Sequence, residues 1–368
     1  MSAKKKSSKD LKWRAGLAGL GAVGAAAGVS TVHSLRSRGR VKDDPYADED
    51  FTILQADRST VVTTPDGVSL AVREVGPADA RLTVVFSHGF CNNMGSFHFQ
   101  RARLAEQWGD QVRMVFYDQR GHGQSDQAPA ETYTVPQLGQ DLEAVLNVMV
   151  PRGPVVLVGH SMGGMTVLAH ARQFPQYYPS RICGVAIIAS AVQGVSRSPV
   201  GEVLQNPVIE AAKAAVRFAP KTITRGRGAA RRALSPILRA ASFGDQRVSR
   251  AVSRYSEKMI NTTSMTTMIE FLHALESHDE ADALPVLDRV PVLIACGDKD
   301  LLTPPAKSVA MARQLPKAEL IVVPGAGHMV QMEQPDLIND ALVRLVDRAT
   351  PSALVALTRR IRDKTRRG

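Results

Sequence analysis

The sequence predicts an α/β protein with a mainly parallel sheet of eight strands, helices on both faces of the sheet and a helical cap. Short, almost continuous apolar runs such as VVLVGH and VLIACG recur along the chain, as in strands that are buried on both faces. Segments of helix length separate most of these runs. Small and polar residues follow the runs directly, which places chemistry-bearing side chains at the carboxyl ends of the strands.

The first two strands are predicted as a hairpin, because residues 59–76 (STVVTTPDGVSLAVREVG) contain two strand-like runs joined by a Pro-Asp-Gly turn. Six further strands are predicted at residues 82–89, 112–118, 155–161, 182–190, 290–297 and 319–325. Helices are predicted between them, at residues 97–108, 136–150, 161–174, 305–314 and 335–347.

One interval interrupts this alternation. About one hundred residues separate the strand at 182–190 from the strand at 290–297, too many for a simple crossover. We therefore predict a core formed by residues 58–191 and 261–350, with a helical cap inserted at 192–260. Residues 1–57 form a basic, Gly/Ala-rich segment followed by an acidic linker, and residues 351–368 form a basic tail.

The net charge of +11 is distributed unevenly. Residues 1–42 carry +9, residues 195–260 carry +9 and residues 358–368 carry +5, which leaves −12 for the rest of the chain. A nucleic-acid-binding domain would carry positive charge on its folded body, so the charge distribution argues against this class of protein. Basic extensions on an acidic core favour contact with an anionic membrane surface instead.

Residues 15–32 are free of charged side chains and lie between basic flanks. Eighteen residues approach the length of a membrane span, but eleven of them are Gly or Ala, so insertion would be weak. Three interpretations stay open: a weak membrane anchor, an export signal, or a soluble or disordered tail. Without an anchor or a signal, a cytoplasmic protein is expected. The oligomeric state is not predicted.

No cofactor and no metal are expected. The three cysteines, Cys91, Cys183 and Cys296, are too few and too scattered for a disulfide framework or a zinc cluster. The sequence contains no HExxH motif, no paired CxxC motif and no Walker loop, and no strand precedes the GAVGAA segment.

The run VVLVGHSMGG at residues 155–164 joins a predicted strand to a predicted helix through a serine surrounded by glycines. Gly159 and Gly163 would let neighbouring backbone approach a tight turn, with Ser161 at its apex. This arrangement is typical of a G-x-S-x-G nucleophile elbow. The first N–H groups of the helix, including that of Met162, would lie unpaired at the positive end of the helix dipole.

A serine hydroxyl needs a base and an orienting acid to become a nucleophile. His328, in the GAGHMV segment after the last predicted strand, is the candidate base. Asp298 and Asp300 compete as the acid in the GDKDLLTP segment. Asp300 is favoured, and Asp298 is more typical of a turn or cap residue.

A second oxyanion donor is expected from the loop after the run VVFSHGF, at the backbone N–H of Phe90. His88 in this loop and His122 in the YDQRGHGQSD segment (117–126) are expected to be structural. Asp118 and Arg120 are expected to form an internal ion pair or hydrogen-bond network.

The segments SHGF, YDQRGHGQSD, GHSMGG, GDKDLLTP and GAGHMV together resemble the α/β-hydrolase family, and more narrowly its serine esterase, lipase and non-haem haloperoxidase-like branch. The resemblance covers residues 58–350. It implies Ser161 as nucleophile, Asp300 as acid and His328 as base, with Phe90 and Met162 as oxyanion donors.

The predicted function is that of a serine hydrolase that cleaves a carboxylic ester, including lipid-like acyl esters, through an acyl-enzyme. The expected partner is a small-molecule ester. Thioesterase, amidase and perhydrolase or haloperoxidase-like activities on the same triad are the alternatives. A catalytically silent, membrane-tethered binding protein is a further alternative, disfavoured because all three triad residue types are present.

Overall fold

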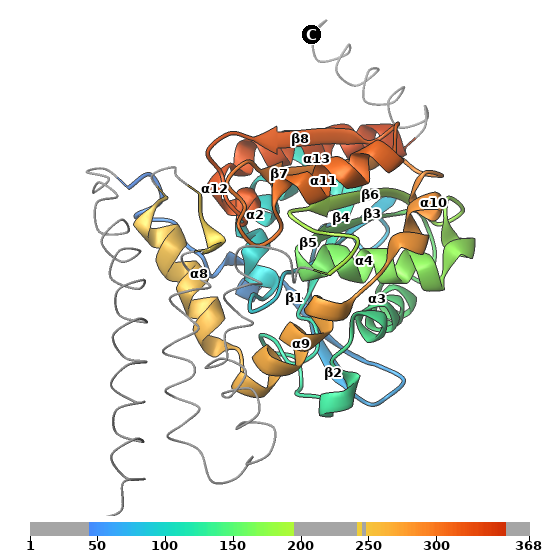
Figure 1. Ribbon diagram of the computed structural model, residues 1–368, viewed down its shortest axis with the longest axis horizontal. Helices are drawn as coiled ribbons and strands as arrows, with labels where there is room; N and C mark the ends of the chain where they lie inside the picture. Colours follow the sequence, from blue (N-terminus) through green and yellow to red (C-terminus); the bar gives the residue numbers. More distant parts are fainter. Residues whose placement is uncertain (1–43, 195–240, 245–247, 351–368) are drawn as a thin grey trace, which may run out of the picture. The chain divides into compact units, whose positions relative to one another are not determined.

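The computed structural model describes residues 44–194, 241–244 and 248–350. An eight-stranded sheet runs through it in the order β1-β2-β4-β3-β5-β6-β7-β8 (Figure 1). Strand β2 is antiparallel to both of its neighbours, and all other neighbours are parallel. The predicted fold class, a mainly parallel sheet of eight strands, is therefore confirmed. The strands are β1 Arg58–Thr63, β2 Ser69–Val75, β3 Leu82–Ser87, β4 Val112–Tyr117, β5 Val155–His160, β6 Ile182–Ile188, β7 Val292–Gly297 and β8 Glu319–Val323.

Burial along the strands follows their place in the sheet. All residues of β3, β5 and β7 are buried, because these central strands are covered on both faces. The edge strand β8 alternates between more and less exposed residues, and Leu320 and Val322 are exposed. Five of the six residues of β1, the other edge strand, are exposed. The continuous apolar runs of the sequence thus mark the interior of the sheet.

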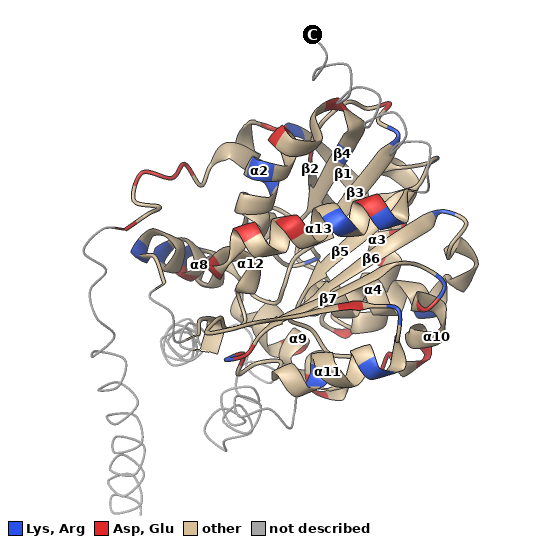
Figure 2. Ribbon diagram, turned by 90° about the horizontal axis from the view of Figure 1, so that it is seen from above, with Lys and Arg blue, Asp and Glu red and all other residues tan. Residues whose placement is uncertain are grey.

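The helices on the body of the sheet mix acidic and basic side chains, as α13 shows (Figure 2). Apolar residues of these helices face the sheet, and α13 buries Ile338, Leu342 and Leu345. Local signals fix several helix starts: the Thr134 side chain accepts a hydrogen bond from the Gln137 N–H at the start of α3, and Pro335 is the first residue of α13.

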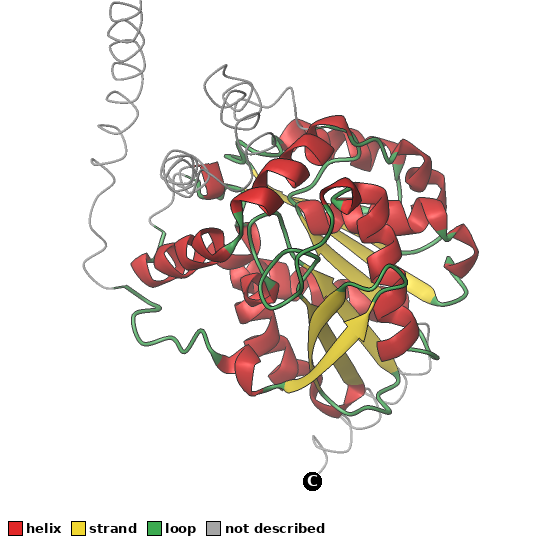
Figure 3. Cartoon of the chain, turned by 90° about the horizontal axis from the view of Figure 1, so that it is seen from below, coloured by secondary structure: helices red, strands yellow, loops and turns green. Residues whose placement is uncertain are grey.

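Helices cover the sheet on both faces (Figure 3). Helices α3, α4 and α11 share one apolar cluster with the sheet, whereas α2 and α13 share another cluster on the opposite face. The predicted helices agree closely with those observed in these layers. Their bounds are α2 His98–Trp108, α3 Val135–Met149, α4 Met162–Gln173, α11 Pro305–Gln314 and α13 Pro335–Ala349, with the shorter α10 Leu284–Leu287 and α12 Val330–Glu333.

The parallel register brings the loops of interest to one edge of the sheet. Ser87, at the end of β3, pairs in register with Gly159 near the end of β5. Gly297, at the end of β7, pairs with Val323 at the end of β8. Because the carboxyl ends of parallel strands meet at the same edge, the loops after β3, β4, β5, β7 and β8 converge there.

Only part of the predicted cap falls within the described residues. Residues 195–240 and 245–247 lie outside them, as do the predicted anchor at 15–32 and the basic tail at 351–368. Helix α8 (Arg250–Thr262) runs across residue 260, the predicted end of the cap, and α9 (Met265–Ser277) follows it. Among the described residues, no helix has the length and apolarity needed to cross a membrane.

Candidate active site

Ser161 lies at the turn between β5 and α4 with an unusual backbone conformation. Its φ is 53° and its ψ is −119°, a region that residues with a Cβ rarely adopt. Such a conformation costs on the order of 1–3 kcal/mol and persists only where surrounding contacts impose it. Here the Ser161 N–H donates to the Ile188 carbonyl at 2.9 Å, and the Ser161 carbonyl accepts the Ser190 hydroxyl at 2.7 Å. The strained turn leaves the Ser161 residue 7% exposed at the sheet edge.

The glycines around Ser161 are required by close backbone contacts. A Cβ on Gly159 would collide with the backbone of Gly163, and a Cβ on Gly163 would collide with the Ser87 carbonyl at the end of β3. A Cβ on Gly164 would lie 2.6 Å from the Ser190 side chain. The elbow therefore packs directly against both neighbouring strands, and only glycine fits at these positions.

His328 contacts Asp300 across two neighbouring loops. His328 Nδ1 lies 2.9 Å from Asp300 Oδ2, and both side chains are almost fully buried. The Leu302 and Thr303 N–H groups each donate to Asp300 Oδ1 at 2.9 Å, so the carboxylate is held in place. Because a carboxylate only accepts, Nδ1 carries the proton, and the neutral His328 ring is left with an unprotonated Nε2, as a general base requires.

The competing acid, Asp298, has a different contact. Its Oδ1 accepts the Gly325 N–H at 2.6 Å, which ties the loop after β7 to the loop after β8. This is the turn role that the sequence indicates for Asp298. The structure thus brings Asp300, and not Asp298, to the His328 ring, while the catalytic roles of both His328 and Asp300 stay predictions.

The residue next to Ser161 joins the elbow to the His328 loop. His160 Nε2 donates to the His328 carbonyl at 2.9 Å, and the two imidazole rings are 5.0 Å apart between centroids. Burial lowers the pKa of His160 to about 3, so its ring stays neutral at physiological pH. No role for His160 is predicted from the sequence, where its only signal is its place between Gly159 and Ser161.

Phe90 lies in the loop after β3, and Met162 directly follows Ser161. Met162 is the first residue of α4, where N–H groups have no acceptor within the helix. The Gly89 carbonyl is bonded by His88 Nδ1 at 2.8 Å and by the Asn92 N–H at 3.1 Å. A trans peptide directs its C=O and N–H in opposite directions, so these bonds point the Phe90 N–H away from the side on which His88 Nδ1 and the Asn92 N–H lie. Its role as a donor stays a prediction.

Two buried histidines fix the loop that carries Phe90. His88 Nε2 accepts the Gln119 N–H at 2.9 Å, and His122 Nε2 accepts the Cys91 N–H at 3.2 Å. Burial lowers the pKa of His88 well below its usual value and that of His122 to about 4, so both rings are neutral. The Cys91 N–H is already bonded, which leaves it unable to serve an oxyanion in place of Phe90. Burial also raises the pKa of the Cys91 thiol, which is therefore unreactive.

The predicted pairing of Asp118 with Arg120 is wrong. The fully buried Arg120 guanidinium binds Asp141 at 2.6 Å through two nitrogens, and Asp66 at 2.9 Å through a third. Asp118 instead accepts the N–H groups of Met94 and Gln124, each at 2.8 Å. The partners of Arg120 come from distant segments, the β1–β2 turn and helix α3, and sequence proximity gave no sign of either.

Glu333 is a further residue at this edge, and no motif in the sequence marks it. Its Oε1 accepts the Gly327 N–H at 2.8 Å, one residue before His328, and its Oε2 accepts the Gly244 N–H at 2.9 Å. Burial raises its pKa to about 7. Glu333 thus ties the His328 loop to residues 241–244, where Met329 N–H also bonds the Ser242 carbonyl at 2.8 Å.

Within residues 44–194, 241–244 and 248–350, no group of three His, Cys, Asp or Glu side chains is placed to hold a metal ion. All three cysteines are free thiols, with Cys91 and Cys296 buried and Cys183 half-buried.

Comparisons with known proteins agree with the fold. A family model described as the alpha/beta hydrolase fold matches residues 83–335. A non-heme chloroperoxidase of Streptomyces lividans is 28% identical over 77% of this chain and 98% of its own length. A proline iminopeptidase of Pestalotiopsis fici is 25% identical over 74% of this chain and 94% of its own length. The structure of a thermophilic esterase from Thermogutta terrifontis superposes with a TM-score of 0.62 at 25% identity, covering 79% of this chain and 99% of that one.

Proposed function

Because this chain belongs to the α/β-hydrolase fold family, we propose that it is a serine hydrolase that cleaves carboxylic esters through an acyl-enzyme. One observation carries the proposal: His328, oriented by Asp300 at 2.9 Å, is joined through its carbonyl to His160, the residue next to Ser161 in the strained elbow. A hydroxyl on a strand-to-helix turn, an imidazole with a free Nε2 and a buried carboxylate are the components of acyl transfer.

In the proposed reaction, His328 Nε2 takes the proton of the Ser161 hydroxyl while Ser161 Oγ attacks the ester carbonyl. The negative charge that develops on the carbonyl oxygen is stabilised by the N–H groups of Phe90 and Met162. The protonated His328 then gives its proton to the leaving alcohol, and the acyl-enzyme remains. Water, deprotonated by His328, attacks the acyl carbon; the acid is released and Ser161 recovers its proton.

The role of Asp300 is electrostatic and orienting. Its carboxylate accepts the Nδ1 proton of His328, which fixes the tautomer and stabilises the imidazolium that forms in each half-reaction. The N–H groups of Leu302 and Thr303 and the Thr303 hydroxyl stabilise the charge on Asp300. Asp300 therefore acts on the reaction through His328 and does not exchange protons with substrate.

Active-site labelling with a fluorophosphonate tests this proposal. The wild-type protein is expected to label covalently and to hydrolyse p-nitrophenyl acetate and butyrate, whereas Ser161→Ala should do neither. Ser308→Ala, which removes another buried serine hydroxyl, on α11, is the matched control and should label like wild type. A folded wild-type protein that neither labels nor hydrolyses esters would favour a catalytically silent binding protein.

The acyl donor and acceptor define the narrower alternatives. Thioesters and amides would form the same acyl-enzyme but release a thiol or an amine as the leaving group. Hydrogen peroxide would replace water as the group that attacks the acyl-enzyme. Comparing kcat/KM for an ester, a thioester and an anilide of one acyl chain separates esterase, thioesterase and amidase activity. Adding peroxide and bromide to the acetate ester assay then tests for peracid formation, and lengthening the acyl chain tests for a lipid-like substrate.

For residues 15–32 the proposal remains a weak membrane anchor, supported by their lack of charge and their basic flanks. Deleting residues 1–42 is expected to move the protein from the membrane to the supernatant fraction without loss of ester turnover. Unchanged fractionation would contradict an anchor, and cleavage of the segment in cells would identify an export signal.

A further inference from the structure

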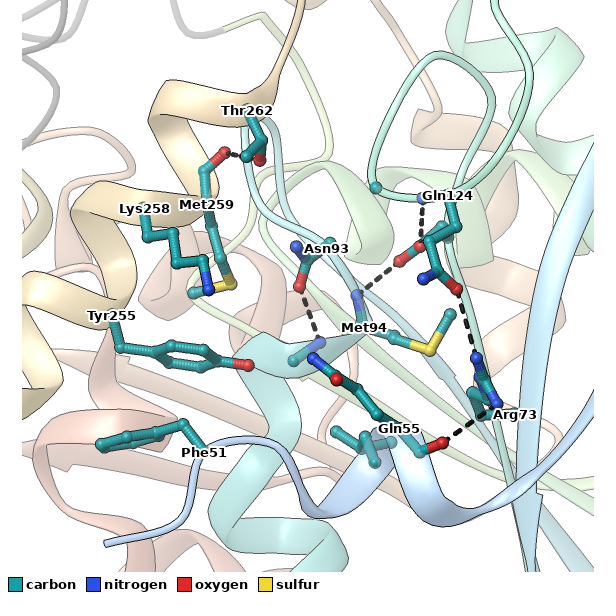
Figure 4. Close-up of a pocket in the computed structure, with 14 residues that line it drawn as sticks. Phe51, Gln55, Arg73, Asn93, Met94, Gln124, Tyr255, Lys258, Met259 and Thr262 are labelled. Carbon is teal, nitrogen blue, oxygen red and sulfur yellow. Dashed lines mark hydrogen bonds between the residues drawn. The ribbon is translucent and has the colours of Figure 1, made fainter. Parts of the chain in front are cut away.

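A cavity of about 220 Å³ lies between helix α8 and the loops that follow strands β3 and β4 (Figure 4). This volume corresponds to roughly seven water molecules at about 30 Å³ each, enough for a small organic ligand. Within the described part of the chain, Ser161, Asp300 and His328 are not among its lining residues. The cavity is therefore distinct from the proposed hydrolytic site.

Hydrogen-bond donors dominate the polar wall of this cavity. Asn93 Oδ1 accepts the Gly95 N–H at 2.9 Å, which leaves the Asn93 side-chain NH2 to donate. Gln124 Oε1 faces Arg73 Nη2 at 3.4 Å, which likewise leaves the Gln124 side-chain NH2 to donate. The exposed Lys258 ammonium has no hydrogen-bond or ion-pair partner among the residues that the structure describes. Figure 4 shows Lys258 reaching from α8 toward Asn93.

The charge balance of the wall favours an anion. Arg73 and Lys258 contribute two positive charges. Asp118 contributes a carboxylate, but the Met94 and Gln124 N–H groups already bond its two oxygens at 2.8 Å. Burial raises the pKa of Asp118 to about 6, so the carboxylate is still largely charged at pH 7, and the three charged side chains leave the wall with one net positive charge. A cationic ligand would have to share the Asp118 oxygens with these two N–H groups, whereas an anion meets the unpaired donors of Lys258 and of the Asn93 side-chain amide.

Apolar side chains form the opposite wall. Phe51 stacks on Tyr255, with ring centroids 4.4 Å apart and an interplanar angle of 23°. Met94 and Met259 also line the space, and both are buried. A Cβ at position 95 would collide with the Tyr255 hydroxyl, so the glycine at this position leaves room for the Tyr255 side chain. These walls suit a ligand that combines an anionic group with an apolar, aromatic body.

We propose that this cavity binds a small organic carboxylate, of the aromatic-acid class, at a site separate from the hydrolytic one. The carboxylate accepts from Lys258 and from the side-chain amide of Asn93, and the apolar body packs against Met94 and Met259. The flexible thioethers adapt to such a body better than branched side chains would. Recognition depends on a charge-assisted hydrogen bond, which makes Lys258 the residue that selects an acid over its neutral analogue.

Methyl-resolved NMR of the full chain with ¹³C-labelled methionine tests the proposal, with sodium benzoate as the probe. Benzoate should shift the Met94 and Met259 methyl signals with a dissociation constant of about 1 mM, as expected for a ligand of its size. Benzamide has the same shape without the charge, and should bind about tenfold more weakly. Signals are assigned with the Met94→Leu and Met259→Leu variants.

Lys258→Gln should weaken benzoate binding about tenfold, whereas Lys317→Gln, which removes the same charge from an exposed lysine outside the cavity lining, should not. Equal weakening of benzoate binding by both variants would mean that only the net charge of the protein matters, and would overturn the proposed site. Shifts confined to Met162 and Met329, which flank Ser161 and His328, would place benzoate in the hydrolytic site and equally overturn the proposal. So would unshifted Met94 and Met259 signals. Ester turnover is not part of this readout, so failure of either proposal is recognised independently of the other.

Discussion

His328 Nδ1 lies 2.9 Å from Asp300 Oδ2, although the two residues are 28 positions apart and follow different strands. Strands β7 and β8 are parallel neighbours, and their register brings both loops to the same edge of the sheet. The contact is therefore a direct product of the sheet topology. It fixes Nδ1 as the His328 nitrogen that faces Asp300, which leaves Nε2 as the nitrogen able to take up a proton.

Asp300→Asn is expected to lower kcat for ester hydrolysis by about 10⁴-fold with little change in KM. The introduced amide can donate to Nδ1 of His328, which favours the tautomer whose Nε2 is protonated and cannot act as a base. Steady-state kinetics with p-nitrophenyl butyrate measure the effect. Asp298→Asn is the matched control, because an asparagine at this position can still accept the Gly325 N–H. A larger loss for Asp298→Asn would reverse the assignment of the acid.

Gly163→Ala should destabilise the protein by about 3 kcal/mol and strongly reduce turnover. The new Cβ would collide with the Ser87 backbone, which leads directly into the loop that carries Phe90. Gly153→Ala offers a comparison of a different kind: its φ is +96°, but no atom lies within 4 Å of the added Cβ. That substitution should cost about 1–2 kcal/mol through backbone conformation alone and leave kcat unchanged.

Urea unfolding and ester kinetics on both glycine variants separate steric collision from backbone strain. If Gly163→Ala is as stable and as active as Gly153→Ala, the elbow is less tightly packed than the structure indicates.

His88→Phe is expected to lower kcat by about 10²-fold while KM stays near its wild-type value. His88 orients the Gly89–Phe90 peptide through its bond to the Gly89 carbonyl, and the Phe90 N–H is proposed to act only on the oxyanion. His88 is thus a positioning residue. The split between kcat and KM distinguishes this role from a general loss of folded protein.

The control for His88 is His170→Phe. His170 is also fully buried and bonds Glu143 and Tyr178, each at 3.0 Å, on helix α4 away from the elbow. This variant should lose stability and keep its kcat. Equal losses of kcat in the two variants would contradict a positioning role for His88.

Periodicity and motif spacing were sufficient to predict the sheet, its covering helices and the placement of Ser161, Asp300 and His328 after strand ends. The reason is physical: a buried strand must be continuously apolar, and a strand-to-helix turn this tight admits only glycine at positions such as Gly159 and Gly163. These constraints are local, so they are visible in a short stretch of sequence.

The pairing of buried polar groups could not be predicted in this way. Arg120 binds Asp66 and Asp141 instead of its near neighbour Asp118, because the register of β1 and the packing of α3 decide which carboxylates reach it. His160 and Glu333 were missed for the same reason. Their hydrogen bonds join segments that meet only in the folded protein, and no pattern in the sequence marks them.

The pH dependence of stability should reveal Glu333. Its folded-state pKa is raised from 4.5 to about 7, so between these values the folded protein holds a proton that the unfolded chain has released. The protonated Glu333 side chain thus makes its full contribution to the free energy of unfolding below about pH 4.5, and this contribution is lost as pH rises through 7. The difference in unfolding free energy between wild type and Glu333→Gln should therefore fall by about 3 kcal/mol from pH 4.5 to pH 8.

Urea unfolding of both proteins across this range measures the difference. The buried histidines change the unfolding free energy with the opposite sign, but they are present in both proteins, so their contributions largely cancel in the difference. Because Glu333 bonds both the Gly327 and Gly244 N–H groups, the Gln variant should also lose one of these two contacts at every pH. A difference that stays flat, or that grows with pH, would mean that Glu333 is ionised throughout. The carboxylate would then hold the His328 loop as a permanent charge rather than as a group that shares a proton near neutrality.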